Sequence, residues 1–436
     1  MELADYEKIE RELFDFVEHF RPLLGRRDRA DWCEKYLCGL MLEGERKSIQ
    51  PMSERVPGGD EQAMQQFVNQ SPWDSVVIQD ALWHYTLQRH QLPKGVLILD
   101  DTALPKKGKH SVGVARQYCG ALGKIANCQS VVSWHYASEH VHFPCVGELY
   151  LPEEWTKDLP RMKKVGVPQR RFDFQKKWQL ALDLLDRITS ISYHVITMDA
   201  GYGECREFLK ELDAREEKFI AQIPESHGFW PLDIELNEKN LEQGRTRQYP
   251  QIKDRSQKAR SAKQWAQWLE KNAKWKSITL PLQTPKTVEV CEIEVWETTS
   301  GAYYRPGPKR RLIIQKNANG EIKYFVSNLD KGISLKQVVL WANERWKIEQ
   351  GYQQLKEELG LDHFEGRSWN GLHHHITLCF MAYVFLLGIK KKFDERIGLP
   401  TLPKVRKWLS EIFLIQMCPH CCRIIHKPKL IFFDPD

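Results

Sequence analysis

The chain has 436 residues, of which 42% are hydrophobic, and a formal net charge of +6. It is long enough for roughly two or three domains with separate cores, and its composition is that of an ordinary globular protein. The longest apolar run, residues 376–388, is too short to span a bilayer, so we expect a buried helix and no membrane partner. Residues 1–20 lack the features of a secretory signal, and the eleven cysteines stand mostly alone in apolar surroundings. We therefore expect a reducing, cytoplasmic setting.

Residues 1–92 are predicted to form an N-terminal helical domain. Apolar residues recur there at helical spacing, and proline and glycine separate the segments. Several short helices with basic turns fit a helix-turn-helix-like reader of DNA, and they fit a small packing bundle equally well. We assign this segment to DNA binding, with the bundle as the alternative.

In residues 93–224 the sequence pattern changes from that of helices to that of β-strands. Apolar runs and glycine-rich turns predict a meander of three strands at 96–101, 111–120 and 128–140, the first of which ends on Asp100 and Asp101. A helix at 174–190, a strand that ends on Asp199, a helix at 204–214 and a strand at 218–224 follow. This order predicts an α/β fold with an RNase H-like core, a mixed five-stranded sheet with helices.

Residues 225–332 are predicted to form a β-rich insertion domain, because strand-like segments follow a basic stretch there. In that stretch, residues 245–276, lysines and arginines are interleaved with tryptophans, which suits a phosphate backbone and unstacked bases. The alternative is a solvated helical face whose tryptophans enter the core. Residues 333–395 show helical periodicity and are predicted to complete the RNase H-like core. Residues 396–436 are assigned as a C-terminal tail.

Carboxylates mark two strand ends and one late helix. In an RNase H-like sheet the first and fourth strands are neighbours, so Asp100 or Asp101 would lie near Asp199, and a later helix would bring Glu349 close. Clustered carboxylates repel one another unless cations bridge them, and oxygen ligands suit Mg²⁺ or Mn²⁺. Two such ions can drive phosphoryl transfer on nucleic acid. Each acid alone also fits a structural role as a cap or turn former, and periodicity does not choose between Asp100 and Asp101.

The spacing of Arg345, Glu349 and Lys356 in ERWKIEQGYQQLKEELG resembles the Tyr-Arg-Glu-Lys signature of DDE transposases of bacterial insertion sequences, in the group named after insertion sequence four. The stretches DDTALPKKGKHSVGVARQYCGALGK and FEGRSWNGLHHHITLCFMAYVFL are similar to the branch named after insertion sequence seven hundred and one. Ala342 replaces the signature tyrosine, so an aromatic contact would have to come from Trp341 or Tyr352.

The resemblance implies roles for individual residues. Asp100, selected over Asp101 by an Asp-x-Thr pattern, would be a catalytic metal ligand together with Asp199 and Glu349. Arg345 and Lys356 would grip phosphates near the cleaved DNA end. Further predicted DNA contacts are Lys106, Lys107, Lys109, Trp341, Arg367 and Trp369.

The resemblance further implies a DNA transposase that binds terminal inverted repeats and catalyses metal-dependent cleavage and strand transfer in cut-and-paste transposition. We therefore expect double-stranded DNA as the partner, a homodimer on DNA, and a bacterial cytoplasmic location at the nucleoid. Two alternatives are an RNase H-like nuclease without strand transfer and a catalytically silent, domesticated DNA-binding protein.

Two further clusters suggest metal less strongly. His373, His374 and His375 diverge around a helix by about 100° per residue, so they cannot share one ion, and core or capping roles are favoured. The tail segment CPHCCRIIH, residues 418–426, would need a second ligand pair to hold structural zinc, and a thiol cluster is favoured there.

Overall fold

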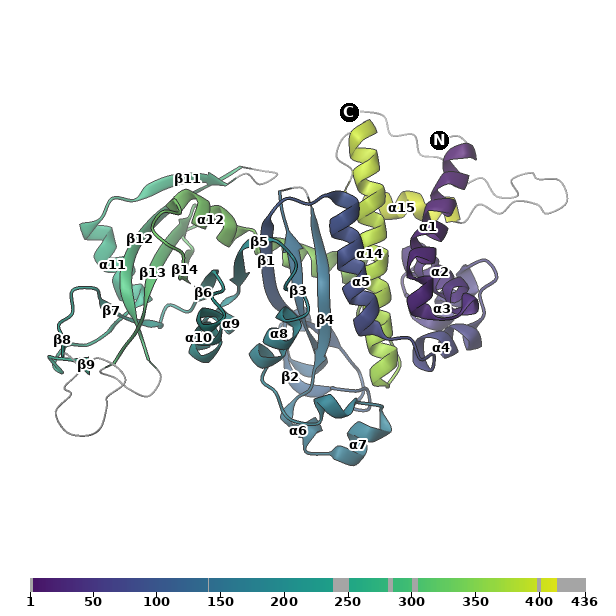
Figure 1. Ribbon diagram of the computed structural model, residues 1–436, viewed down its shortest axis with the longest axis horizontal. Helices are drawn as coiled ribbons and strands as arrows, with labels where there is room; N and C mark the ends of the chain where they lie inside the picture. Colours follow the sequence, from purple (N-terminus) through teal and green to yellow (C-terminus); the bar gives the residue numbers. More distant parts are fainter. Residues whose placement is uncertain are drawn as a thin grey trace.

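The computed structural model describes residues 3–139, 141–237, 251–280, 285–299, 305–397 and 401–413. Helices lie at one end of the molecule, a β-rich region lies at the other, and a mixed sheet connects them (Figure 1). The predicted mixed α/β class is therefore confirmed.

The first part of the chain is helical, as predicted. Its helices are α1 (Leu3–Leu24), α2 (Arg27–Met41), α3 (Ile49–Arg55), α4 (Glu61–Asn69) and α5 (Ser75–His90). Asp60 and Asp74 cap α4 and α5, because their carboxylates accept hydrogen bonds from backbone N–H groups of the first helical turn. Helices α2, α4 and α5 pack against the long helix α14 (Trp369–Ile397) (Figure 1). The N-terminal helices are thus joined to the rest of the protein through α14.

Six strands form the central part of the sheet: β1 (Gly95–Pro105), β2 (Ala115–Cys119), β3 (Lys124–Ala137), β4 (His142–Tyr150), β5 (Tyr193–Met198) and β6 (Phe219–Ile223). Strand β3 lies antiparallel between β1 and β4, while β5 runs parallel to both β1 and β6. The resulting order β4-β3-β1-β5-β6 puts β1 and β5 side by side, as the sequence predicted.

Two predicted strand boundaries were wrong. Strand β1 does not end at Asp100 and Asp101 but continues to Pro105, because this part of β1 pairs with β3. The predicted strands at 111–120 and 128–140 are present as β2 and β3, with β2 limited to Ala115–Cys119, but β4, which pairs with β3, was not predicted. Pro144 and Gly147 concealed β4 in the sequence, and a register shift after Trp134 accommodates the proline.

The β-rich segment continues the core sheet. It contributes β7 (Gly228–Pro231), β10 (Arg260–Ser261), β11 (Lys276–Leu280), β12 (Lys286–Thr298), β13 (Pro306–Asn317) and β14 (Ile322–Ser327), with β8 (Leu236–Asn237) and β9 (Gln251–Ile252) as a separate pair. Strand β14 pairs antiparallel with β6, so the five-stranded core extends into a sheet of twelve described strands.

Within the basic stretch, residues 262–272 form helix α11 (Ala262–Asn272). Trp265 is buried in the core, whereas the side chain of Trp268 is 39% exposed. The reading that turns the tryptophans into the core is therefore correct for Trp265 and incorrect for Trp268.

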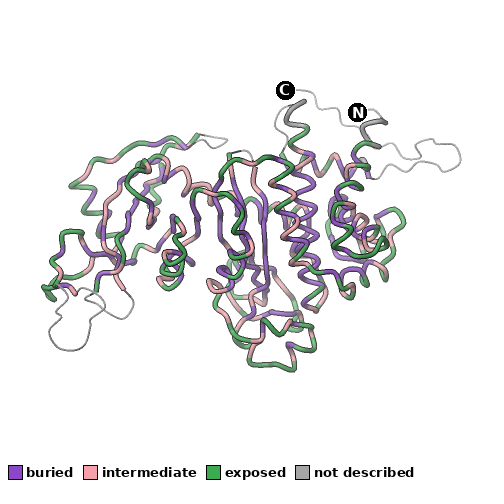
Figure 2. Tube along the Cα trace, viewed as in Figure 1, coloured by how far each residue is buried: buried purple, intermediate pink, exposed green. Residues whose placement is uncertain are grey.

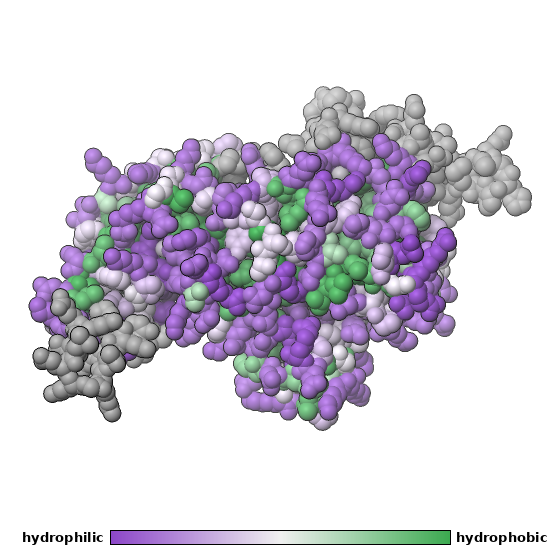
Figure 3. Space-filling view, in the orientation of Figure 1, coloured by the Kyte–Doolittle hydropathy of each residue, from purple (hydrophilic) through white to green (hydrophobic). Residues whose placement is uncertain are grey.

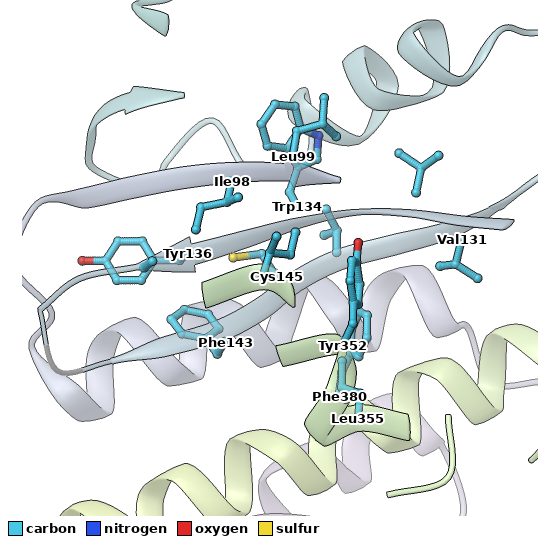
Figure 4. Close-up of a cluster of buried hydrophobic side chains, with 14 of the residues drawn as sticks. Ile98, Leu99, Val131, Trp134, Tyr136, Phe143, Cys145, Tyr352, Leu355 and Phe380 are labelled. Atoms are coloured by element: carbon cyan, nitrogen blue, oxygen red, sulfur yellow. The ribbon is translucent and has the colours of Figure 1, made fainter. Parts of the chain in front are cut away.

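Helices cover both faces of the core sheet. On one face, Trp134 donates its indole N–H to the carbonyl of Ala181 in α8 (Lys177–Leu185) at 2.8 Å. On the other face, Tyr352 of α13 (Trp346–Glu357) and Phe380 of α14 pack against the strands (Figure 4). The remaining helices are α6 (Glu153–Thr156), α7 (Leu159–Lys164), α9 (Ala200–Gly203), α10 (Arg206–Ala214), α12 (Leu335–Asn343) and α15 (Leu402–Phe413).

Helix α14 is the buried core helix that the apolar run predicted. Its segment Trp369–Lys392 is long and apolar enough to cross a membrane, but 94% of the most apolar window is buried inside the protein. Figure 2 shows the same helix as a largely buried element between the sheet and the N-terminal helices. Packing against both neighbours explains its composition without a bilayer.

Candidate active site

Asp100 and Asp101 point to opposite faces of the sheet, as neighbours in a strand must. Asp100 pairs with Ser133 of β3 and lies on the face that α13 covers. The Asp101 carboxylate lies on the α8 face, where it accepts hydrogen bonds from Lys177 Nζ and Ser130 Oγ, both at 2.7 Å. Asp101 is therefore paired with a cation of its own, and Asp100 has a different environment.

Asp199 follows the last residue of β5 and lies at the same edge as Asp100. The parallel register pairs Leu99 of β1 with Met198 of β5, so the two aspartates come next on adjacent strands. Asp199 Oδ1 accepts a hydrogen bond from Tyr202 N at 3.1 Å and thereby caps α9. The structure thus brings together the two acids that the sequence predicted to meet.

Burial, together with the nearby carboxylates of Asp199 and Asp101, raises the pKa of Asp100 to about 8, against a lowering effect of Arg345. Burial also raises the pKa of Asp199, although its hydrogen bond from Tyr202 N and the charge of Arg345 act in the opposite direction. In both aspartates burial is the largest cause, and neighbouring carboxylates add to it, because both effects disfavour the ionised form. The pair consequently favours a positively charged neighbour.

Arg345 supplies positive charge to this edge of the sheet. Its Nη1 lies 3.6 Å from Asp100 Oδ2, and its Nη2 lies 2.5 Å from Glu349 Oε1. The Glu349 side chain is 59% exposed and faces the guanidinium. Within the described part of the chain, no three His, Cys, Asp or Glu side chains are arranged to hold a metal ion. Glu349, the predicted third metal ligand, therefore lies near Asp100, but the Arg345 guanidinium lies between the two carboxylates.

Lys356 lies further along α13 and also contacts β1. Its Nζ donates to the carbonyl of Ala103 at 2.9 Å, and burial lowers its pKa. Arg345, which precedes the first residue of α13, and Lys356 within this helix thus both contact β1, at Asp100 and Ala103, while Glu349 contacts Arg345.

A buried chain of hydrogen bonds attaches α13 to β1 and β3. Tyr352 Oη donates to the carbonyl of Asp100 at 3.0 Å and lies 2.7 Å from Ser133 Oγ. Ser133 Oγ in turn lies 3.1 Å from His135 Nε2. Figure 4 shows Tyr352 pointing from the helix toward the strands, on the side opposite Leu99. Tyr352, one of the two aromatic candidates, is therefore used for internal attachment.

The same chain continues to β4 and α14. His135 Nδ1 lies 2.9 Å from His142 Nε2, His142 Nδ1 lies 3.2 Å from Tyr383 Oη, and Tyr383 donates to Gln354 Oε1 of α13 at 2.8 Å. Burial lowers the pKa of both histidines, that of His142 to about 3, so both rings are neutral at pH 7. Gly351 provides the space for this contact, because a Cβ there would lie 2.3 Å from His142 Cε1. Helix α13 is therefore fixed at both Tyr352 and Gln354.

The other predicted DNA contacts differ in their accessibility. Lys107, Lys109 and Arg367 are exposed. Lys106 is partly buried, donates to the carbonyl of Phe364 at 2.5 Å, and has a pKa that burial lowers to about 8. Trp369 is only 5% exposed, so its side chain belongs to the core.

Trp341 is also remote from the aspartate pair. It stacks on His194, with ring centroids 5.0 Å apart, at the beginning of β5, whereas Asp199 follows the end of that strand. The structure thus places Lys356, but not Trp341, beside the end of β1.

The three consecutive histidines have separate buried partners. His373 accepts a hydrogen bond from Leu149 N, His374 contacts the carbonyls of Val68 and Trp73, and His375 contacts Tyr36 Oη. Burial lowers the pKa of each to about 4. These contacts agree with the favoured core roles. The Cys and His residues of the tail lie outside the described residues.

Two residues that shape this site were not predicted from the sequence. Lys177 of α8 pairs with Asp101 on the α8 face of the sheet, and Tyr202 Oη lies 3.5 Å from Asp101 Oδ1. The segment Asp199-Ala-Gly-Tyr-Gly gave a signal for the second of these, since it marks a tight turn directly after a strand. Nothing in the local sequence distinguishes Lys177 from the other surface lysines.

Residues 19–287 match the family model described as DDE superfamily endonuclease. The chain belongs to this family. It is therefore a member of a family of phosphoryl-transfer nucleases, in agreement with the predicted enzyme class. The match includes Asp100 and Asp199 and ends before Glu349, so the assignment of the third acid depends on the signature spacing and on the geometry described above.

One curated relative of this DDE superfamily member is the probable transposase for insertion sequence element IS701 of Microchaete diplosiphon. It is 27% identical over 197 residues, which are 44% of this chain and 49% of the relative, so the match spans about half of the relative's length. Among solved structures, the cryo-EM structure of piggyBac transposase synaptic complex with hairpin DNA is similar with a TM-score of 0.43 and 12% identity. That alignment covers 94% of this chain and 78% of the other.

Proposed function

We propose that this chain is a DNA transposase that cleaves the ends of a transposon and joins them to a new site. The observation that carries the proposal is the meeting of Asp100 and Asp199 on adjacent parallel strands, beneath a helix that presents Arg345 and Glu349. Family membership supports the nuclease chemistry. The partner would be double-stranded DNA, bound by two copies of the chain at the bacterial nucleoid.

Divalent metal ions fit part of this donor set. Asp100 and Asp199 provide hard oxygen donors, and the carboxylates of Asp199 and Asp101 contribute, after burial, to the raised pKa of Asp100, so a cation beside Asp100 would favour its ionised form. Glu349 would complete the set only after its carboxylate turns away from Arg345. Two Mg²⁺ or Mn²⁺ ions, when bound, would activate the nucleophilic water or hydroxyl and stabilise the leaving oxygen.

The protein's own side chains would bind and orient the DNA. The planar guanidinium of Arg345 can donate two parallel hydrogen bonds to a phosphate, and a phosphate at that position would compete with Glu349 for it. Lys356, which donates to Ala103 O, would meet the phosphate on the other side of the aspartates. Asp101 would hold Lys177 on the opposite face and take no direct part.

Cleavage of duplexes that carry the DNA flanking the coding region tests this function. With Mg²⁺, the wild-type protein should produce cut ends and also joined products, whereas Glu349→Gln should produce neither. Glu357→Gln is the matched control, because Glu357 is exposed on the same helix and contacts Gln353. Undiminished cleavage by Glu349→Gln would refute the assignment. Cut ends without joined products would identify a nuclease without strand transfer, and DNA binding without any cleavage would identify a silent DNA-binding protein.

A further inference from the structure

The hairpin between β2 and β3 exposes a concentration of apolar side chains. Tyr118 is 69% exposed, Ile125 is 59% exposed and Leu122 is 47% exposed, and these are the three highest values among large hydrophobic side chains in the described part of the protein. Tyr118 and Ile125 are directly paired across the two strands. Figure 3 shows that the face of the molecule drawn there is mainly hydrophilic. We call Tyr118, Leu122 and Ile125 the hairpin tip, and a cluster of this kind marks an interaction surface.

The charge around the hairpin tip favours a polyanion. Between Asp101 and Glu139 the sequence contains no Asp or Glu, and its five Lys and Arg residues are Lys106, Lys107, Lys109, Arg116 and Lys124. Arg116 and Lys124 are exposed on the same hairpin as the tip. A second copy of the chain would bring equal positive charges together if the tips faced each other, whereas DNA offers phosphates for the cations and base faces for the apolar side chains.

The hairpin is continuous with the candidate active site. Lys356 donates to Ala103 near the end of β1, and that end pairs with Cys128 of β3. Cys128 in turn pairs with Ala115 of β2, so the end of β1 lies next to the hairpin. DNA held at Lys356 would therefore pass the hairpin as it leaves the site.

We propose that the hairpin tip is a wedge that inserts its apolar side chains beside a base step of the bound duplex, while Arg116 and Lys124 contact the flanking phosphates. This inference rests on the proposed function, because DNA must first bind at the site. Apolar wedges of this kind unstack neighbouring bases, and aromatic side chains replace part of the lost stacking. The wedge would thus loosen the duplex next to the position at which it is cut.

The test measures base unstacking without cleavage. A mixed-sequence duplex with 2-aminopurine at successive positions is titrated with the full-length protein in EDTA, and both fluorescence intensity and anisotropy are recorded. The wild-type protein should raise the fluorescence at one or two positions. The double variant Tyr118→Ser/Ile125→Thr should abolish this rise and weaken binding about tenfold, which corresponds to the contribution of one stacked base. Tyr118→Phe should retain the rise.

Ile322→Thr is the matched control, because Ile322 is an exposed strand residue, 37% accessible, in β14. It should bind and unstack DNA like the wild type. Unchanged unstacking by the double variant would overturn the wedge and leave the proposed transposase intact. If the double variant binds DNA like the wild type but loses concentration-dependent self-association in sedimentation velocity, the hairpin tip contacts a second copy of the chain instead. If the wild-type protein binds no duplex, both the wedge and the proposed function fail.

Discussion

The contact between Gly351 and His142 makes a prediction about how α13 is held. In Gly351→Ala, the new Cβ would lie 2.3 Å from His142 Cε1 and 3.1 Å from Nε2. His142 cannot turn away freely, because its ring nitrogens contact His135 and Tyr383. The helix must therefore move outward, and overpacking of this kind costs about 1–3 kcal/mol. Alanine returns about 1 kcal/mol through its higher helix propensity. We expect a net loss of up to about 2 kcal/mol in the free energy of unfolding.

Gly388→Ala in α14 is the matched control. The nearest atom to a Cβ at Gly388 is His90 Cε1 at 3.9 Å, an ordinary contact distance. This variant should be unchanged or up to about 1 kcal/mol more stable, because only the propensity gain applies. Urea unfolding, monitored by tryptophan fluorescence, compares the two variants. Both replace glycine with alanine, but we expect Gly351→Ala to lower the free energy of unfolding and Gly388→Ala to leave it unchanged or raise it.

Activity provides a second measurement for Gly351→Ala. The outward shift of α13 would move Arg345, Glu349 and Lys356 together, and a misplacement of about 1 Å can reduce a rate on the order of a hundredfold. In a His142→Ala background the cost of Gly351→Ala should shrink, because the obstructing ring is gone. If Gly351→Ala is as stable and as active as the wild type, α13 is not positioned by this contact.

Three further predictions concern the strand ends and the buried network. In the folded protein, burial and Asp199 raise the pKa of Asp100 to about 8, whereas the unfolded chain releases this proton near pH 4. The free energy of unfolding should therefore decrease as pH rises from about 4 to 8. Asp100→Asn should remove this loss, and urea midpoints measured from pH 5 to 9 would disprove the reasoning if the variant keeps the wild-type slope. Asp101→Asn should instead lower stability by up to about 1 kcal/mol, since Lys177 loses a partly exposed ion pair, and in a Lys177→Met background this effect should largely disappear. Tyr352→Phe should cost about 1–3 kcal/mol, because Ser133 Oγ and the Asp100 carbonyl lose a buried partner, whereas Tyr118→Phe should leave the melting temperature unchanged.

Local patterns predicted most of the elements around the site, because their signals are contained in short segments. The apolar run before Asp100, the run before Asp199 and the spacing of Glu349 each reflect a strand or helix whose periodicity is visible without the rest of the chain. Strand β4 was not predicted, because Pro144 and Gly147 weaken the strand pattern of its sequence. The register shift that accommodates Pro144 forms only when β3 pairs with β4.

The sequence by itself predicted the mixed α/β class, the helical N-terminal part, the proximity of Asp100 or Asp101 to Asp199, and the helix that carries Glu349 and Lys356. Tertiary structure alone decided which of the two neighbouring acids faces α13. Alternation along a strand requires the two side chains to point to opposite faces of the sheet, but it does not say which face a later helix will cover. Tertiary structure also placed Lys177 on Asp101 and Arg345 between Asp100 and Glu349. The Lys177–Asp101 and Arg345–Asp100 pairings join residues distant in the chain, and their electrostatic energies depend on separations and burial that appear only when the sheet and its helices have assembled.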